Sequence, residues 1–70
     1  MDDYKERMKT EYQELKERHT KLSRILVKHD AHTLEFELNC PAGLLREQKD
    51  LMGRYLNVLE IRAEIEGVAL

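Results

Sequence analysis

Apolar residues recur at steps of three and four between residues 41 and 67, and this period indicates one face of a helix. The positions of this first row are Leu45, Gln48, Met52, Tyr55, Leu59 and Ala63. A second row repeats every seven residues beside it and consists of Leu44, Leu51, Val58 and Ile65. Pro41 suits the first turn of a helix, and Gly67 suits a left-handed helix end. We therefore predict a helix over residues 41–66, with Val68 folded back on its last turn.

A second amphipathic stretch covers residues 3–28. Asp3 followed by Glu6 resembles a capping box, which satisfies the first N–H groups of a helix. The apolar positions alternate in steps of four and three and are Met8, Tyr12, Leu15, His19, Leu22 and Leu26. Because His19 lies within this row, we expect a packed or hydrogen-bonded histidine there. Both predicted helices span roughly 35–40 Å, so the sequence predicts an all-α fold, an antiparallel two-helix hairpin.

Residues 29–40 connect the two predicted helices. Leu34, Phe36 and Leu38 alternate with glutamates, and this period of two is typical of a strand. Because a single short strand is not stable alone, the segment either pairs with its copy in another subunit or forms an extended lid over the helix ends. We favour the lid. Residues 1–70 then form a single domain.

The apolar surface predicted for residues 41–66 is wider than one partner helix covers, which is a stripe of roughly 100°. A chain of this size buries only about 60% of its unfolded surface, and one cysteine permits no intramolecular disulfide. Self-association is the remaining source of stability. We therefore predict a homo-oligomer, a helical bundle, although ordinary half-exposed apolar residues are the alternative interpretation. The predicted interface residues are Leu44, Leu51, Val58, Ile61 and Ile65.

Charge and hydropathy exclude several classes of partner. The 12 Lys and Arg residues against 14 Asp and Glu give a net charge of −2, which does not fit binding to polymeric nucleic acid. No apolar run approaches the roughly 18 residues of a membrane span, and no secretory signal is recognisable. We therefore expect no membrane partner and a cytoplasmic location.

The sequence contains no arrangement of residues typical of catalysis. It has no glycine-rich phosphate loop and no serine nucleophile motif. His29 and His32 flank Asp30, but the spacing is loose and no fourth ligand follows, so we predict no metal site. Nothing in the sequence positions Cys40 as a nucleophile. We therefore predict a protein that is not an enzyme and that needs no cofactor.

Two basic features are candidates for binding an anionic ligand. Residues 16–28 carry five cations against Glu17 alone, although a solvated basic face is the alternative interpretation. Elsewhere tyrosines alternate with arginines, and such pairs can stack on bases and hold phosphates. Tyr12 and Tyr55 also have core spacing, which makes packing their default role. The candidate ligand-binding residues are Tyr4, Arg7, Tyr12, Arg18, Lys21, Arg24, Lys28, Phe36 and Arg54.

A pattern of helix-surface residues extends along both predicted helices. Its residues are Arg7, Met8, Glu11, Tyr12, Leu15, Lys16, Arg18, Lys21 and Leu22, followed by Leu44, Leu45, Gln48, Met52, Tyr55, Leu56, Leu59, Arg62, Ala63, Glu66 and Gly67. This pattern resembles that of small phage and prophage proteins related to an uncharacterised protein of a crAss-like phage. Those proteins are similar in size and hairpin architecture to the phage sponges that defeat CBASS and Thoeris immunity. The sponges are oligomers that hold cyclic oligonucleotides or cyclic ADP-ribose signals between subunits without cleaving them.

The resemblance implies a phage-encoded anti-defence protein in the host cytoplasm. It would sequester a cyclic nucleotide immune signal at subunit interfaces, as a homo-oligomer and without catalysis. Two alternatives remain open. One is a protein–protein inhibitor of a host effector, which would use the acidic residues Glu60, Glu64 and Glu66 as a charge mimic. The other is a structural or assembly accessory protein whose oligomer is its function.

Overall fold

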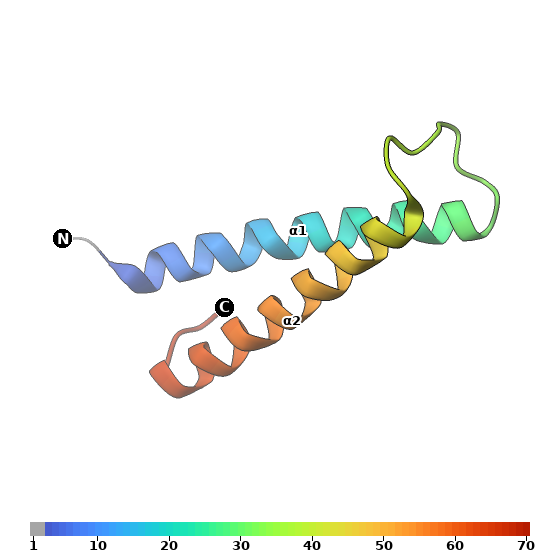
Figure 1. The fold of residues 1–70 in the computed structure, drawn as a ribbon. Helices are drawn as coiled ribbons and strands as arrows, with labels where there is room; N and C mark the ends of the chain where they lie inside the picture. The colour runs from blue at the N-terminus through green and yellow to red at the C-terminus, as the bar shows by residue number, and fades with distance from the viewer. Residues whose placement is uncertain (1–2) are drawn as a thin grey trace.

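The computed structural model describes residues 3–70, which form two helices, α1 (Tyr4–Asp30) and α2 (Ala42–Glu66). The helices run antiparallel and pack against each other, and residues 31–41 connect them at one end of an elongated molecule (Figure 1). No strand occurs within residues 3–70, and the connecting segment lies outside any sheet. The all-α hairpin is therefore confirmed.

Local signals set both ends of α1. The carboxylate of Asp3 accepts from the N–H of Lys5 at 2.9 Å, and its carbonyl accepts from two further N–H groups of the first turn. The helix runs to Asp30, beyond the expected end at residue 28, because nothing in this stretch breaks it. The chain leaves the helix at His32, which has a left-handed φ of 61°. The N–H of Thr33 then closes the turn on the carbonyl of Lys28 at 2.9 Å.

A proline precedes the first turn of α2, and a glycine ends its last turn. Pro41 is the residue before the helix, and its carbonyl accepts from the N–H groups of Leu44 and Leu45. Gly67 ends the helix with a φ of 70°, a conformation that only glycine adopts without steric cost. The N–H of Val68 donates to the carbonyl of Ala63 at 2.8 Å, and its side chain is buried, so the tail folds back on the last turn as expected.

The core is one thin layer between the helices. Its buried residues are Met8, Tyr12, Leu15 and Leu26 from α1, Leu56, Leu59 and Ala63 from α2, and Val68. His19 is half-buried, and its ring lies beside Gly53. Two expectations for the first row of α2 are wrong. Tyr55 remains 42% exposed and Leu56 takes the inward position, and Gln48 is exposed as well. The helix is therefore rotated so that Tyr55 lies at the edge of the core.

Candidate functional site

An open groove of about 640 Å³ runs along the N-terminal half of α1. Its lining residues are Glu6, Arg7, Thr10, Glu11, Glu14, Leu15, Arg18 and Tyr55. Positions 7, 11, 14 and 18 follow helical spacing, so they form one stripe on the surface of α1. The stripe has an arginine at each end, roughly 16 Å apart along the helix axis, and carboxylates between them.

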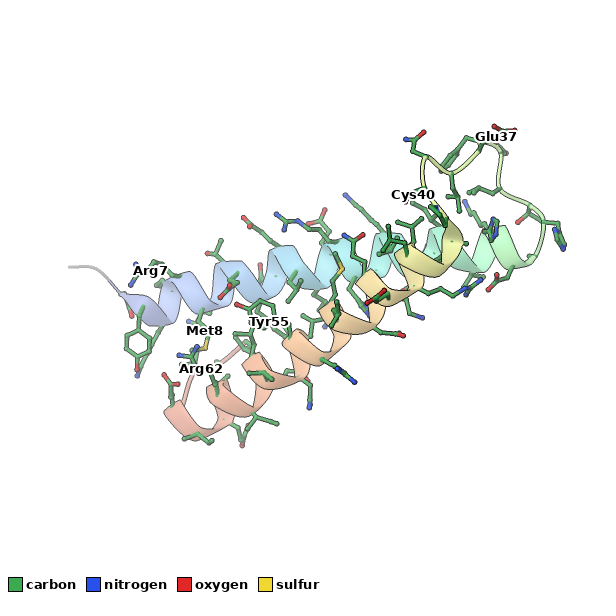
Figure 2. All side chains as sticks on the ribbon, in the orientation of Figure 1. Arg7, Met8, Glu37, Cys40, Tyr55 and Arg62 are labelled. Atoms are coloured by element: carbon green, nitrogen blue, oxygen red, sulfur yellow. The ribbon has the colours of Figure 1, made fainter. Side chains whose placement is uncertain are left out.

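Tyr55 is the contribution of α2 to this groove. Figure 2 shows Tyr55 between the two helices, together with Met8 and Arg62. The hydroxyl of Tyr55 donates a hydrogen bond to the carboxylate of Glu11, and this bond raises the pKa of Tyr55. The bond holds the ring at the groove while leaving much of it exposed. Its aromatic surface is therefore available to a bound molecule.

The groove combines three kinds of recognition chemistry. Guanidinium groups bind phosphates through paired hydrogen bonds. An exposed tyrosine ring stacks on a nucleobase or another flat ring. Carboxylates accept hydrogen bonds from hydroxyl and amino groups. Arg18 lies 3.9 Å from Glu14, and both side chains are largely exposed, so this contact contributes little and a ligand can replace it.

Two of the predicted site residues lie in the groove, and two others are hydrogen-bonded to α2 outside it. Arg7 and Arg18 line the groove, whereas Tyr4 and Tyr12 do not. Tyr12 is buried, its hydroxyl donates to Glu60 at 2.6 Å, and that hydrogen bond raises the pKa of Tyr12. The ammonium group of Lys16 lies 5.7 Å from the centre of the Tyr12 ring. Tyr12 therefore serves the core, and so does not present its ring to the groove.

Tyr4 is the first residue of α1 and lies beside the last turn of α2. Its ring is exposed, and the hydrogen-bonded carboxylate of Glu66 raises the pKa of Tyr4. The guanidinium of Arg62 contacts the same carboxylate at 3.1 Å. Tyr4 is therefore part of a polar cluster that joins the start of α1 to the end of α2.

The remaining predicted cations lie outside the groove lining. Lys21 pairs with Glu17 at 3.0 Å, and Arg24, Lys28 and Arg54 are exposed elsewhere on the two helices. Sequence reasoning also leaves Glu11 and Glu14 out of the candidate site and assigns Tyr55 to the core by its spacing. The signal that could have found the two carboxylates is their spacing from the arginines, which places all four on one stripe.

Phe36 lies in the connecting segment, far from the groove along the molecule. It lines a second hollow of about 480 Å³ with His29, His32, Leu34, Glu37, Leu38, Cys40 and Ala42. Figure 2 shows Glu37 and Cys40 at this loop end. Asp30 pairs with Arg46 beside the hollow, and the guanidinium lowers the pKa of Asp30. Although His29, His32 and Cys40 share this hollow, no three side chains of metal-ligating type in the described part of the chain are arranged so that they could hold a metal ion.

The residues predicted as an oligomer interface form an apolar surface on α2. Leu44, Leu51, Val58, Ile61 and Ile65 are between 50% and 79% exposed. The rest of residues 3–70 leaves at least half of each of these side chains uncovered. Neither α1 nor α2 has the continuous apolar length needed to cross a membrane.

A family model described as Sequestin matches residues 2–65, a span that includes the groove, both rows of α2 and nearly all of each helix. The chain belongs to the Sequestin family. Searches of curated proteins and of solved structures gave no match. The groove with Arg7, Arg18 and Tyr55 is therefore the candidate site of a Sequestin protein, and the family name suggests binding rather than catalysis.

Proposed function

We propose that this Sequestin protein sequesters a nucleotide immune signal in the groove of α1. One observation carries the proposal: a stripe on α1 sets two arginines at the ends of a groove beside the exposed ring of Tyr55. The family name describes sequestration, that is, removal of a signalling molecule by binding. In this proposal the signal is a cyclic nucleotide of a defence system such as CBASS or Thoeris. The protein is phage-encoded, related to the crAss-like phage proteins, and acts in the host cytoplasm.

The charges of the groove indicate how such a ligand would lie. Arg7 and Arg18 hold phosphates at the two ends, and Tyr55 stacks on a base. Glu11 and Glu14 repel phosphate from the middle of the groove, where they accept hydrogen bonds from sugar hydroxyls instead. The ligand therefore has phosphates that can reach the ends and a polar, uncharged part between them. Binding leaves its covalent bonds unchanged.

Thermal melting of the purified protein against cyclic dinucleotides, cyclic trinucleotides and cyclic ADP-ribose isomers tests the proposal. A ligand at 100 times its dissociation constant stabilises the folded state by about 2.7 kcal/mol. For a domain of this size we expect a rise in melting temperature of roughly 10–20 °C. Chromatography of the released ligand should recover it intact. If no nucleotide in the panel raises the melting temperature, the proposal is wrong.

A matched pair of arginine variants locates the site. Arg18→Ala removes a groove cation and should weaken nucleotide binding at least about tenfold, because hydrogen bonds between charged groups are the strong ones. Arg24→Ala makes the same change on the same helix outside the groove and should bind as the wild type does. Isothermal titration calorimetry measures both affinities. Equal losses in the two variants would point to a diffuse basic face rather than the groove.

The acidic residues offer less support for a charge mimic of a host target. Glu60 accepts from Tyr12, and Glu66 pairs with Arg62, so two of the three carboxylates are engaged within the hairpin. Nucleotide sequestration is therefore the function that the geometry favours.

A further inference from the structure

The row of Leu44, Leu51, Val58 and Ile65 is a long apolar surface that the hairpin leaves uncovered. Each of these side chains is at least half exposed. A row that repeats every seven residues is the pattern that packs along a second helix in a coiled coil. The row extends roughly 32 Å along α2, so a helix of similar length can cover it.

The row is symmetric about its midpoint, which falls between Arg54 and Tyr55. Leu44 and Ile65 lie equally far from this midpoint, and so do Leu51 and Val58. A second copy of α2 that runs antiparallel about this point therefore sets an apolar side chain opposite an apolar side chain along the whole row. Such a self-complementary surface is what a two-fold interface requires.

The charges beside the row decide the direction of the second copy. Glu47 and Arg62 also lie equally far from the midpoint. Antiparallel packing sets Glu47 of one copy opposite Arg62 of the other, whereas parallel packing sets like charges opposite each other. The present partner of Arg62 is Glu66, in a partly exposed pair that contributes little and does not prevent a second contact.

We propose that two copies of this chain pack antiparallel along this row, and that Tyr55 of each copy completes the groove of the other. Tyr55 lies next to the midpoint and lines the groove, so the two-fold axis brings both Tyr55 rings to the place where the two grooves meet. Each groove then has two aromatic rings, between which a base can stack. This inference rests on the proposed function, because it names the subunit interface and the partner residue of that site.

Crosslinking with single cysteines tests the direction and register of the pair. In a Cys40→Ser background, Arg54→Cys places a thiol near the two-fold axis, and Leu44→Cys places one near the end of the row. A short bis-maleimide should join two Arg54→Cys chains and leave Leu44→Cys chains single. If both variants crosslink, the pair is parallel; if neither does, the row does not carry the interface. Either result overturns the proposal.

Light scattering after gel filtration tests the surface itself. The wild type should elute as a dimer and Val58→Glu as a monomer, with an unchanged helical circular dichroism spectrum. Val27→Glu is the matched control, because Val27 is 65% exposed on α1 and lies outside the row. Glu47→Arg should weaken the dimer, and Glu47→Arg combined with Arg62→Glu should restore it. A monomeric wild type, or equal dissociation of the Val27 and Val58 variants, would contradict the proposal.

Nucleotide binding separates this inference from the proposed function. Val58→Glu should lose at least about tenfold in affinity for the nucleotide that stabilises the wild type, since a stacked base contributes on this scale. If the dimer forms but no nucleotide binds, the interface is correct and the proposed function is wrong. If the Val58→Glu monomer binds as tightly as the wild type, sequestration is correct and the completed groove is wrong.

Discussion

Tyrosine hydroxyls connect the helices on different sides of the hairpin. Tyr12 of α1 donates to Glu60 of α2, and Tyr55 of α2 donates to Glu11 of α1. Tyr12 faces the hollow that Lys16 and Leu70 also line, whereas Tyr55 faces the groove. These reciprocal bonds fix the rotation of each helix about its own axis. The position of the groove ring therefore depends on contacts that are separate from the apolar core.

At the residue scale, Tyr12→Phe should destabilise the hairpin by about 1 kcal/mol, because it removes one partly exposed hydrogen bond to a charged acceptor. Urea denaturation of the wild type and the variant measures the difference. Phe36→Leu is a suitable control, since Phe36 is exposed and is not a member of the core cluster. A Tyr12→Phe variant as stable as the wild type would show that solvent replaces the bond without cost.

The stability contributed by the hydrogen bond between Tyr12 and Glu60 should depend on pH. A tyrosine whose pKa is raised on folding stabilises the folded state while it is protonated, and this contribution is lost as pH rises through the folded pKa. Because the ordinary pKa is 10.0 and the bond to Glu60 raises the pKa of Tyr12, the stability difference between wild type and Tyr12→Phe should hold below pH 10 and shrink above it. Lysine deprotonation affects both proteins alike. A difference that stays constant at high pH would contradict the assignment.

At the scale of the element, the two ends of α2 hold glycines with opposite requirements. Gly43 is in the first turn, and a Cβ there would meet nothing within 4 Å. Gly67 has a φ of 70°, where a Cβ is strained in any surroundings. Gly43→Ala should therefore stabilise the protein by about 0.5–1 kcal/mol, and Gly67→Ala should destabilise it by about 1–2 kcal/mol. Thermal unfolding of the two variants would show shifts of opposite sign, and shifts of equal sign would contradict this account.

The sequence predicted the elements better than the site, for physical reasons. Asp3, Pro41 and Gly67 are strong local signals, and the structure uses all three at helix ends. The end of α1 was placed too early because His32, which turns the chain there, has only a weak preference for a positive φ. Local propensity therefore fixed those ends that carry a specialised residue.

The groove depends on how the helices cross, which no local pattern encodes. Figure 1 shows that the axes of α1 and α2 are inclined to each other. The stripe of α1 that includes Arg7 and Arg18 continues through Lys21 and Lys28, but the groove ends at Arg18. Basic composition alone could not distinguish these cations. Likewise, only the rotation of α2 decides that Leu56 is buried and Tyr55 is not.

At the scale of the whole molecule, the core is one layer thick, so each buried side chain carries a large share of the stability. Leu59 is 1% exposed. Leu59→Ala should cost about 2–5 kcal/mol, against a total of roughly 3.5–10 kcal/mol for a chain of this length. Urea denaturation should therefore show a midpoint far below that of the wild type. Val27→Ala, an exposed truncation, should stay within about 0.5 kcal/mol of the wild type, and an equal loss there would contradict the one-layer core.

Arg7 and Arg18 stand on the same uninterrupted helix, so the distance between them is independent of the loop and of α2. The spacing of these two residues along the helix axis is therefore set before any ligand arrives. For the proposed ligand, this spacing needs no rearrangement before binding, which favours an association rate limited by encounter. Under the proposed function each groove binds one signal molecule at a time, so the number of molecules held cannot exceed the number of grooves. Under the proposed function, the amount of protein produced, more than its affinity, then limits how much signal is removed.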